Sequence, residues 1–144
     1  MVKRAIAILF LVGVLGLLLI QLVPYGRDHT NPAVVSEPAW DSAATRATAV
    51  KVCFDCHSNQ TVWPWYSNIA PMSWLVQHDV DEGRKHLNFS TWTAGQGAEA
   101  PFMVESDQMP PMQYMLAHPE ARLSEADKAA FIEGLTATLT APAD

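Results

Sequence analysis

An apolar run near the N-terminus is the feature that most constrains this chain. Residues 5–23 read AIAILFLVGVLGLLLIQLV and hold no charged side chain. As an α-helix, these 19 residues would extend about 28 Å, close to the roughly 30 Å hydrocarbon core of a bilayer. Lys3 and Arg4 precede the run, and positive residues favour the cytoplasmic side of a membrane. The sequence therefore predicts that everything after the run lies outside the cytoplasm.

A cleaved signal peptide is the alternative interpretation of this run. The apolar core of a signal peptide usually has about 7–15 residues, and small residues mark the cleavage site that follows it. Here the run is longer, and it ends in Gln21-Leu22-Val23-Pro24-Tyr25. These features favour an uncleaved anchor. We therefore expect a single-pass protein of the cytoplasmic (inner) membrane with its C-terminal domain in the periplasm.

Composition divides the rest of the chain into a linker and a domain. Residues 24–40 hold three prolines and one glycine without an apolar period, which is typical of a linker. We predict a transmembrane helix over 1–23, a stalk linker over 24–40 and one domain over 41–144. The net charge of −6 makes nucleic acid an unfavourable partner, because its phosphates repel an acidic chain.

Helical periodicity dominates the domain, and no alternating strand pattern is visible. Helices are predicted over 43–57, from Met72 to about His86, and from Ser124 onward. Residues 87–111 are expected to be largely irregular. The last helix carries an apolar stripe made of Phe131, Ile132, Leu135 and Leu139. The sequence therefore predicts an all-α fold.

The chemistry of the chain is concentrated in the segment Cys53-Phe54-Asp55-Cys56-His57, which contains both cysteines. Residues three apart on a helix face the same way, so each thiol can form a thioether to one vinyl group of a single porphyrin. His57 follows directly and can place its imidazole under the iron as the proximal ligand. The motif therefore predicts one covalently attached haem c (iron) per chain, held by Cys53, Cys56 and His57.

Other uses of the two cysteines agree less well with the sequence. A thioredoxin-like dithiol needs a βαβ frame, which the pattern lacks. A zinc site needs a second pair of ligands at suitable spacing. A structural disulfide would leave the adjacent histidine unexplained. In bacteria, c-type haem is attached outside the cytoplasm, where the predicted topology independently places this segment.

The second axial ligand of the iron is expected to be a sulfur or nitrogen donor downstream of the motif. The candidates are Met72, His78, His86, Met103, Met109, Met112, Met115 and His118. Met109 is favoured because two prolines follow it, and they stiffen its loop before iron binds. Core packing is the commoner role of a methionine, so His118, Met112 and His78 remain alternatives.

The order of these features resembles the plan of class I cytochromes c. More closely, the chain resembles the bacterial haem-binding domain family of exported, membrane-anchored c-type haem proteins, over about residues 45–140. The resemblance rests on Cys53-Phe54-Asp55-Cys56-His57-Ser58-Asn59, Thr61, Trp63-Pro64-Trp65-Tyr66-Ser67, Ile69-Ala70-Pro71, Gly83-Arg84, Leu87-Asn88-Phe89-Ser90, Trp92, Met109-Pro110-Pro111, Tyr114, His118-Pro119 and Leu123-Ser124. It implies a small cytochrome c-like helical domain, haem attachment at Cys53 and Cys56, and iron ligation by His57. It supports Met109 less firmly.

The sequence departs from the family pattern in one loop. The family often has Ser-Gly shortly before its Met-Pro pair, whereas this chain has Ser106-Asp107-Gln108 before Met109. Aspartate adopts the unusual turn geometries open to glycine less easily. The resemblance alone therefore does not fix the shape of this loop.

Three functions follow from these expectations. The favoured one is a membrane-tethered mono-haem c-type cytochrome for electron transfer to redox partner proteins, with both axial positions filled and no catalysis of its own. If Met109 does not bind the iron, the open site suits a peroxidase-like haem enzyme or a small-ligand sensor. The third is a haem-bearing subunit of a larger membrane complex.

Overall fold

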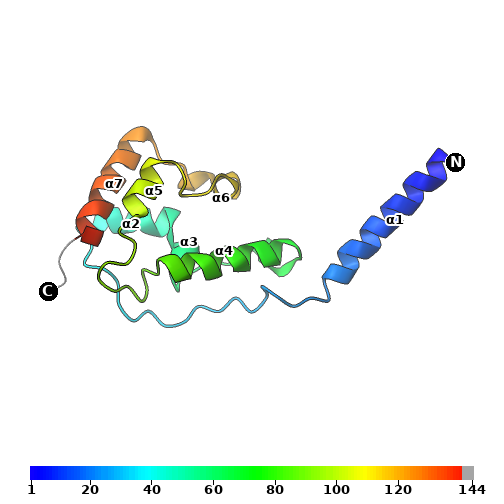
Figure 1. Cartoon of the computed structure of the whole chain (residues 1–144), viewed down its shortest axis with the longest axis horizontal. Helices are drawn as coiled ribbons and strands as arrows, with labels where there is room; N and C mark the ends of the chain where they lie inside the picture. Colours follow the sequence, from blue (N-terminus) through cyan, green and yellow to red (C-terminus); the bar gives the residue numbers. More distant parts are fainter. Residues whose placement is uncertain (141–144) are drawn as a thin grey trace. The chain divides into compact units, whose positions relative to one another are not determined.

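A computed structural model describes residues 1–140 of the chain, and this part is helical (Figure 1). Residues 1–140 contain no β-strand; Ser36 and Thr91 form one isolated bridge. The all-α prediction is therefore confirmed. The helices are α1 (Val2–Ile20), α2 (Ala43–Val52), α3 (Phe54–His57), α4 (Met72–His86), α5 (Ala100–Glu105), α6 (Met112–Ala117) and α7 (Glu125–Thr140), with two short 3₁₀ helices, η1 (Trp65–Asn68) and η2 (Pro119–Ala121).

Helix α1 occupies most of the N-terminal apolar run. It is long and apolar enough to cross a membrane, and none of its residues is buried. The chain forms two compact units. The first combines Met1–His29 with Trp63–Asp79, and the second combines Thr30–Val62 with the chain from Val80 onward. The cysteine motif and Met109 both belong to the second unit.

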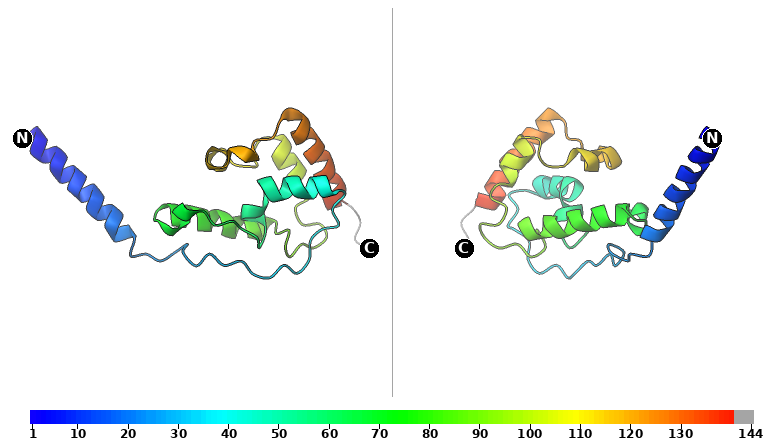
Figure 2. Two further views of the ribbon diagram at one scale, coloured as in Figure 1. Left: turned by 180° about the vertical axis from the view of Figure 1, so that it is seen from behind. Right: turned by 45° about the vertical axis from the view of Figure 1, so that its right-hand side comes forward.

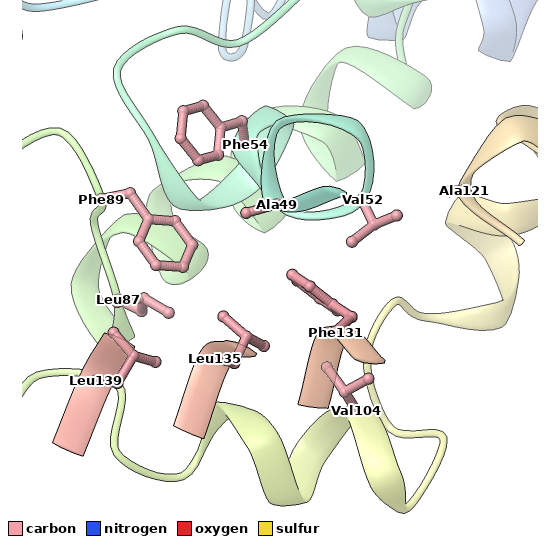
Figure 3. Close-up of a cluster of buried hydrophobic side chains, with 10 residues drawn as sticks. All are labelled: Ala49, Val52, Phe54, Leu87, Phe89, Val104, Ala121, Phe131, Leu135 and Leu139. Atoms are coloured by element: carbon pink, nitrogen blue, oxygen red, sulfur yellow. The ribbon is translucent and has the colours of Figure 1, made fainter. Parts of the chain in front are cut away.

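The core of the second unit lies where α2, α5 and α7 meet the chain that follows α4. Helix α5 lies beside α7 in both views of Figure 2. Phe131 and Leu135 of α7 point toward Ala49 and Val52 of α2 (Figure 3). The buried cluster consists of Ala49, Val52, Phe54, Leu87, Phe89, Val104, Ala121, Phe131, Leu135 and Leu139. Because Phe54 belongs to this cluster, the core fixes the segment between the two cysteines.

The longer predicted helices are present. Helix α4 covers Met72–His86, as its pattern predicted. The predicted helix over 43–57 is divided at Cys53 into α2 and α3, and the Ser42 hydroxyl caps its start by accepting the Thr45 N–H at 3.1 Å. The apolar stripe of α7 is confirmed, with Phe131, Leu135 and Leu139 buried and Ile132 packed against the same core.

The expectation of largely irregular chain over 87–111 is wrong at one place, because it contains α5. Helices α5 and α6 have six residues each. Six residues are fewer than two helical turns, so no apolar repeat can be completed. The one local signal for α5 is Pro101, since proline suits the first turn of a helix.

Part of the segment predicted as a linker makes backbone contacts within the second unit. The N–H groups of Val35 and Ser36 both donate to the Ser90 carbonyl, at 2.8 and 3.1 Å. The Trp92 N–H donates to the Ser36 carbonyl at 3.1 Å. The side-chain amide of Asn59 donates to the Ala33 carbonyl at 3.0 Å. These bonds hold the extended chain against the residues that follow α3 and α4. The boundaries 24–40 and 41–144 stay a prediction.

Candidate haem-attachment site

The two cysteines and the histidine of the motif lie together in one helical turn. Helix α2 ends at Cys53, whose backbone φ and ψ are −125° and −35°, and α3 begins at the next residue. The N–H groups of Cys56 and His57 both donate to the Cys53 carbonyl, at 3.2 and 2.9 Å. Both cysteines are half-buried, and they are not joined in a disulfide. Two thiols and one imidazole therefore lie within one turn of the chain.

The Cys53 thiol does not have the character of a redox-active dithiol. Burial, and then the neighbouring Cys56, raises the pKa of the Cys53 thiol to about 12. Redox motifs of the Cys-x-x-Cys type instead have one thiol with a lowered pKa, because the thiolate is the nucleophile. Cys53 therefore lacks the lowered pKa of a nucleophilic thiol.

The imidazole of His57 is held in a single tautomer by backbone carbonyls. Its Nδ1 lies 3.0 Å from the Gly83 oxygen and 3.1 Å from the Leu87 oxygen. Carbonyl oxygens only accept hydrogen bonds, so Nδ1 carries the proton and Nε2 keeps its lone pair for a metal. Burial also lowers the pKa of His57, so the ring is neutral at pH 7. A hydrogen bond from the ring nitrogen that does not bind the metal fixes the orientation of the imidazole and makes its other nitrogen a stronger ligand.

Gly83 lets α4 approach the motif closely. A Cβ atom at this position would lie 2.4 Å from the Cys56 carbonyl oxygen and 3.0 Å from the Cys56 Cβ. Atoms at such distances overlap, and the nearest one belongs to the backbone, so it cannot rotate away. A side chain at residue 83 would therefore push α4 and its carbonyls away from the His57 ring.

We expect Gly83→Ala to reduce the yield of haem-loaded protein and to lower the free energy of unfolding by about 1–3 kcal/mol, the usual effect of overpacking. The measurements are haem absorbance per chain and thermal unfolding of the purified protein. Gly16→Ala is the control, because a Cβ at residue 16, within helix α1, meets no atom within 4 Å. Wild-type haem content in Gly83→Ala would contradict the importance of this close approach.

Asp55, between the two cysteines, fixes the motif from three directions. Its Oδ1 accepts the Val62 N–H at 2.9 Å, and its backbone carbonyl accepts the Thr61 hydroxyl at 2.7 Å. Its Oδ2 accepts the Tyr114 hydroxyl at 2.8 Å. Burial, and then the bond to Asp55, raises the pKa of Tyr114, so the phenol stays a donor at neutral pH. Helix α6 is thereby tied to the motif turn.

Met109 lies on a separate segment, the loop between α5 and α6. It is half-buried, and its N–H donates to the Met103 carbonyl at 3.0 Å. Tyr114 is the fifth residue after Met109, so the two Cα atoms can be at most about 17 Å apart, and Tyr114 is the residue bonded to Asp55. The structure thus ties the loop of Met109 to the motif turn through Tyr114, and ligation by Met109 stays a prediction.

The departure from the family pattern at Asp107 preserves a glycine-like backbone. Asp107 has a φ of +57°, in the left-handed region that favours glycine. Aspartate tolerates this region better than most residues. Lys128 of α7 contacts the Asp107 carboxylate and donates to the Glu105 carbonyl at 3.2 Å. The ion pair therefore holds the turn that leads into Met109.

Two alternative ligands of the iron have distinct surroundings. The Nδ1 of His118 lies 3.2 Å from a Glu120 carboxylate oxygen, and its ring stacks on Tyr114 with centroids 4.2 Å apart. Met112 is 74% exposed on α6. Met109 and His118 are both half-buried, so burial separates only Met112 from Met109.

The residues of this region fit a covalently bound haem. The motif turn offers two thiols that are not joined in a disulfide, and His57 offers an unprotonated Nε2. Helix α6 has no buried residue, and its Met112 and Leu116 are 74% and 70% exposed. The sequence did not reveal the roles of Asp55, Tyr114 and the Gly83 carbonyl, because these contacts join segments far apart in the chain.

Comparison with known proteins agrees with this geometry. A family model described as a haem-binding domain matches residues 15–137. No match was found among curated proteins or among solved structures. The matched region spans most of the chain and includes the cysteine motif, the carbonyls of Gly83 and Leu87, and the loop of Met109. The chain therefore belongs to the haem-binding domain family.

Proposed function

We propose that this protein is a membrane-tethered mono-haem c-type cytochrome that transfers electrons on the outer side of the cytoplasmic membrane. The observation that carries the proposal is the single helical turn with two cysteines that form no disulfide and a histidine whose Nε2 keeps its lone pair for a metal. Haem binding follows from the family. Covalent attachment, electron transfer and the membrane anchor are the proposed parts.

Each element of the site has a separate task in this proposal. Cys53 and Cys56 each form a thioether, and His57 binds the iron through Nε2. The carbonyls of Gly83 and Leu87 orient the imidazole and increase its basicity. Met109 supplies the second axial ligand, and the bond from Tyr114 to Asp55 positions its loop. When bound, the haem supplies a one-electron iron couple.

The proposed partners are redox proteins with basic docking surfaces. The chain carries a net charge of −6, and complementary charge accelerates the encounter of two proteins. The electron donor and the electron acceptor must both reach the outer face of the membrane, where the proposed anchor holds the domain.

A methionine ligand would raise the reduction potential of the haem iron.

The test of electron transfer uses the full chain, purified in detergent with its haem. We expect one reversible one-electron couple and rapid oxidation by a basic redox protein. The rate should fall about tenfold or more between low and physiological salt, because salt screens the attraction. A small uncharged oxidant is the control, and its rate should depend little on salt.

A different result would favour the alternative function. Rapid turnover of hydrogen peroxide, together with slow and salt-independent reaction with redox proteins, would contradict an electron carrier. That combination would instead indicate a haem enzyme with an open axial position.

A further inference from the structure

The segment from 63 to 75 in the first unit is apolar and partly uncovered. It reads WPWYSNIAPMSWL and contains no charged residue. Its exposed side chains are Trp65, Ile69, Met72 and Leu75, with exposed fractions of 76%, 47%, 41% and 42%. Exposed apolar residues gathered in a short uncharged segment indicate an interaction surface. We call residues 63–75 the apolar segment.

The end of the proposed membrane anchor is bonded directly to the apolar segment. Gln21 is the first residue after α1. Its side-chain amide donates to the Ala70 carbonyl at 2.8 Å and accepts the Ala70 N–H at 3.0 Å. The same amide donates to the Leu17 carbonyl at 3.0 Å and accepts from Arg27 at 2.9 Å. All four hydrogen-bonding positions of the amide are used, so the pairing is specific.

Two further contacts fold the chain after α1 onto the apolar segment. Gly26 has a φ of +79°, and a Cβ there would lie 2.1 Å from the Ser73 carbonyl oxygen. The His29 ring stacks on Trp63 with centroids 4.7 Å apart, and its Nε2 lies 2.9 Å from the Ser67 hydroxyl. The turn between α1 and His29 therefore packs along the apolar segment instead of leading away from it.

We propose that the apolar segment lies in the headgroup region of the same bilayer that α1 spans, with Trp65 and Ile69 in contact with lipid. The inference rests on the proposed membrane anchor. If α1 crosses the bilayer, Gln21 marks its outer boundary, and Ala70 is at hydrogen-bond distance from that residue. Tryptophan concentrates at this boundary, where its ring meets both apolar chains and polar headgroups.

Lipid fits this surface better than another protein does. Trp65, Ile69 and Met72 lie near Ala70 in sequence, and Ala70 is bonded to Gln21, the first residue after α1, so a bilayer around α1 would lie close to them. The segment also lacks the charged groups that would set the orientation of a redox partner. Transfer of these apolar side chains from water into the interface would then hold the first unit at the membrane surface.

Photo-crosslinking of the full chain tests this proposal. Trp65 is replaced by p-benzoylphenylalanine, and the protein is placed in nanodiscs of phosphatidylethanolamine and phosphatidylglycerol. Leu11, inside α1, is the positive control, and Phe102 of α5, which is 60% exposed, is the matched aromatic control in the second unit. We expect lipid adducts at residues 11 and 65, at least tenfold above the yield at residue 102.

The outcomes separate the two proposals. Strong lipid adducts at residue 11 with only the background of residue 102 at residue 65 would overturn the lipid-facing segment and leave the anchor intact. Adducts between residue 65 and a second copy of the chain would overturn it as well. Absence of lipid adducts at residue 11 would instead overturn the anchor.

A second variant tests the pairing of Gln21 with Ala70. Gln21→Glu keeps the shape of the side chain but removes both donors, and it places a carboxylate against the carbonyls of Ala70 and Leu17. We expect the lipid adducts at residue 65 to fall several-fold, while those at residue 11 and the haem spectrum stay unchanged. An unchanged yield at residue 65 would overturn the positioning role of Gln21.

Discussion

Replacing both cysteines, as Cys53→Ser with Cys56→Ser, is expected to remove all haem that survives denaturation. A serine hydroxyl has almost the same size as a thiol but forms no thioether with a vinyl group, so the change removes the covalent bonds with little change in packing. After denaturing electrophoresis, the wild-type band should show haem peroxidase activity and the variant band should show none. Each single variant should retain at most a small fraction of the stain.

Two comparisons make this result specific to the motif. Val50→Ser changes a residue of α2 that is 44% exposed, and it should stain like the wild type. Acidified organic solvent should leave the haem on the wild-type chain and extract it from any variant that binds haem without thioethers. Complete extraction of haem from the wild type would show that the attachment is not covalent, and the c-type assignment would then be wrong.

The single turn that brings Cys53, Cys56 and His57 together was predictable because its geometry is local. Residues three apart on a helix share a face whatever the rest of the fold does, and the structure places Cys53, Cys56 and His57 in one turn. The long helices α4 and α7 were predictable for a related reason. Each has enough turns to display a repeated apolar pattern or clear end signals.

The support around the motif could not be predicted in the same way. The Gly83 carbonyl lies 26 residues from His57 in sequence, and Tyr114 lies 59 residues from Asp55. Periodicity describes one element at a time, so it cannot pair residues on different elements. Gln21 and Ala70, 49 residues apart, show the same limit. These contacts follow from the tertiary fold, which also decides that Asp107 adopts a left-handed backbone.

Met109→Ala is expected to open an axial position of the iron. The turn at Asp107, the ion pair to Lys128 and the two prolines all restrict the loop before ligand binding. A restricted loop loses little conformational entropy when its thioether binds the iron. Removing that thioether should lower the reduction potential by on the order of 0.1 V, because axial ligands are major determinants of haem potential.

Carbon monoxide provides the decisive measurement for Met109. The reduced wild type should bind it slowly or not at all, and the oxidised wild type should be low-spin with a weak near-infrared band from sulfur bound to iron. Met109→Ala should bind carbon monoxide rapidly and lose that band, whereas Met112→Ala and His118→Ala should behave like the wild type. Rapid binding by the wild type itself would show that Met109 is not a firm ligand. The open site would then favour a haem enzyme or a small-ligand sensor over an electron carrier.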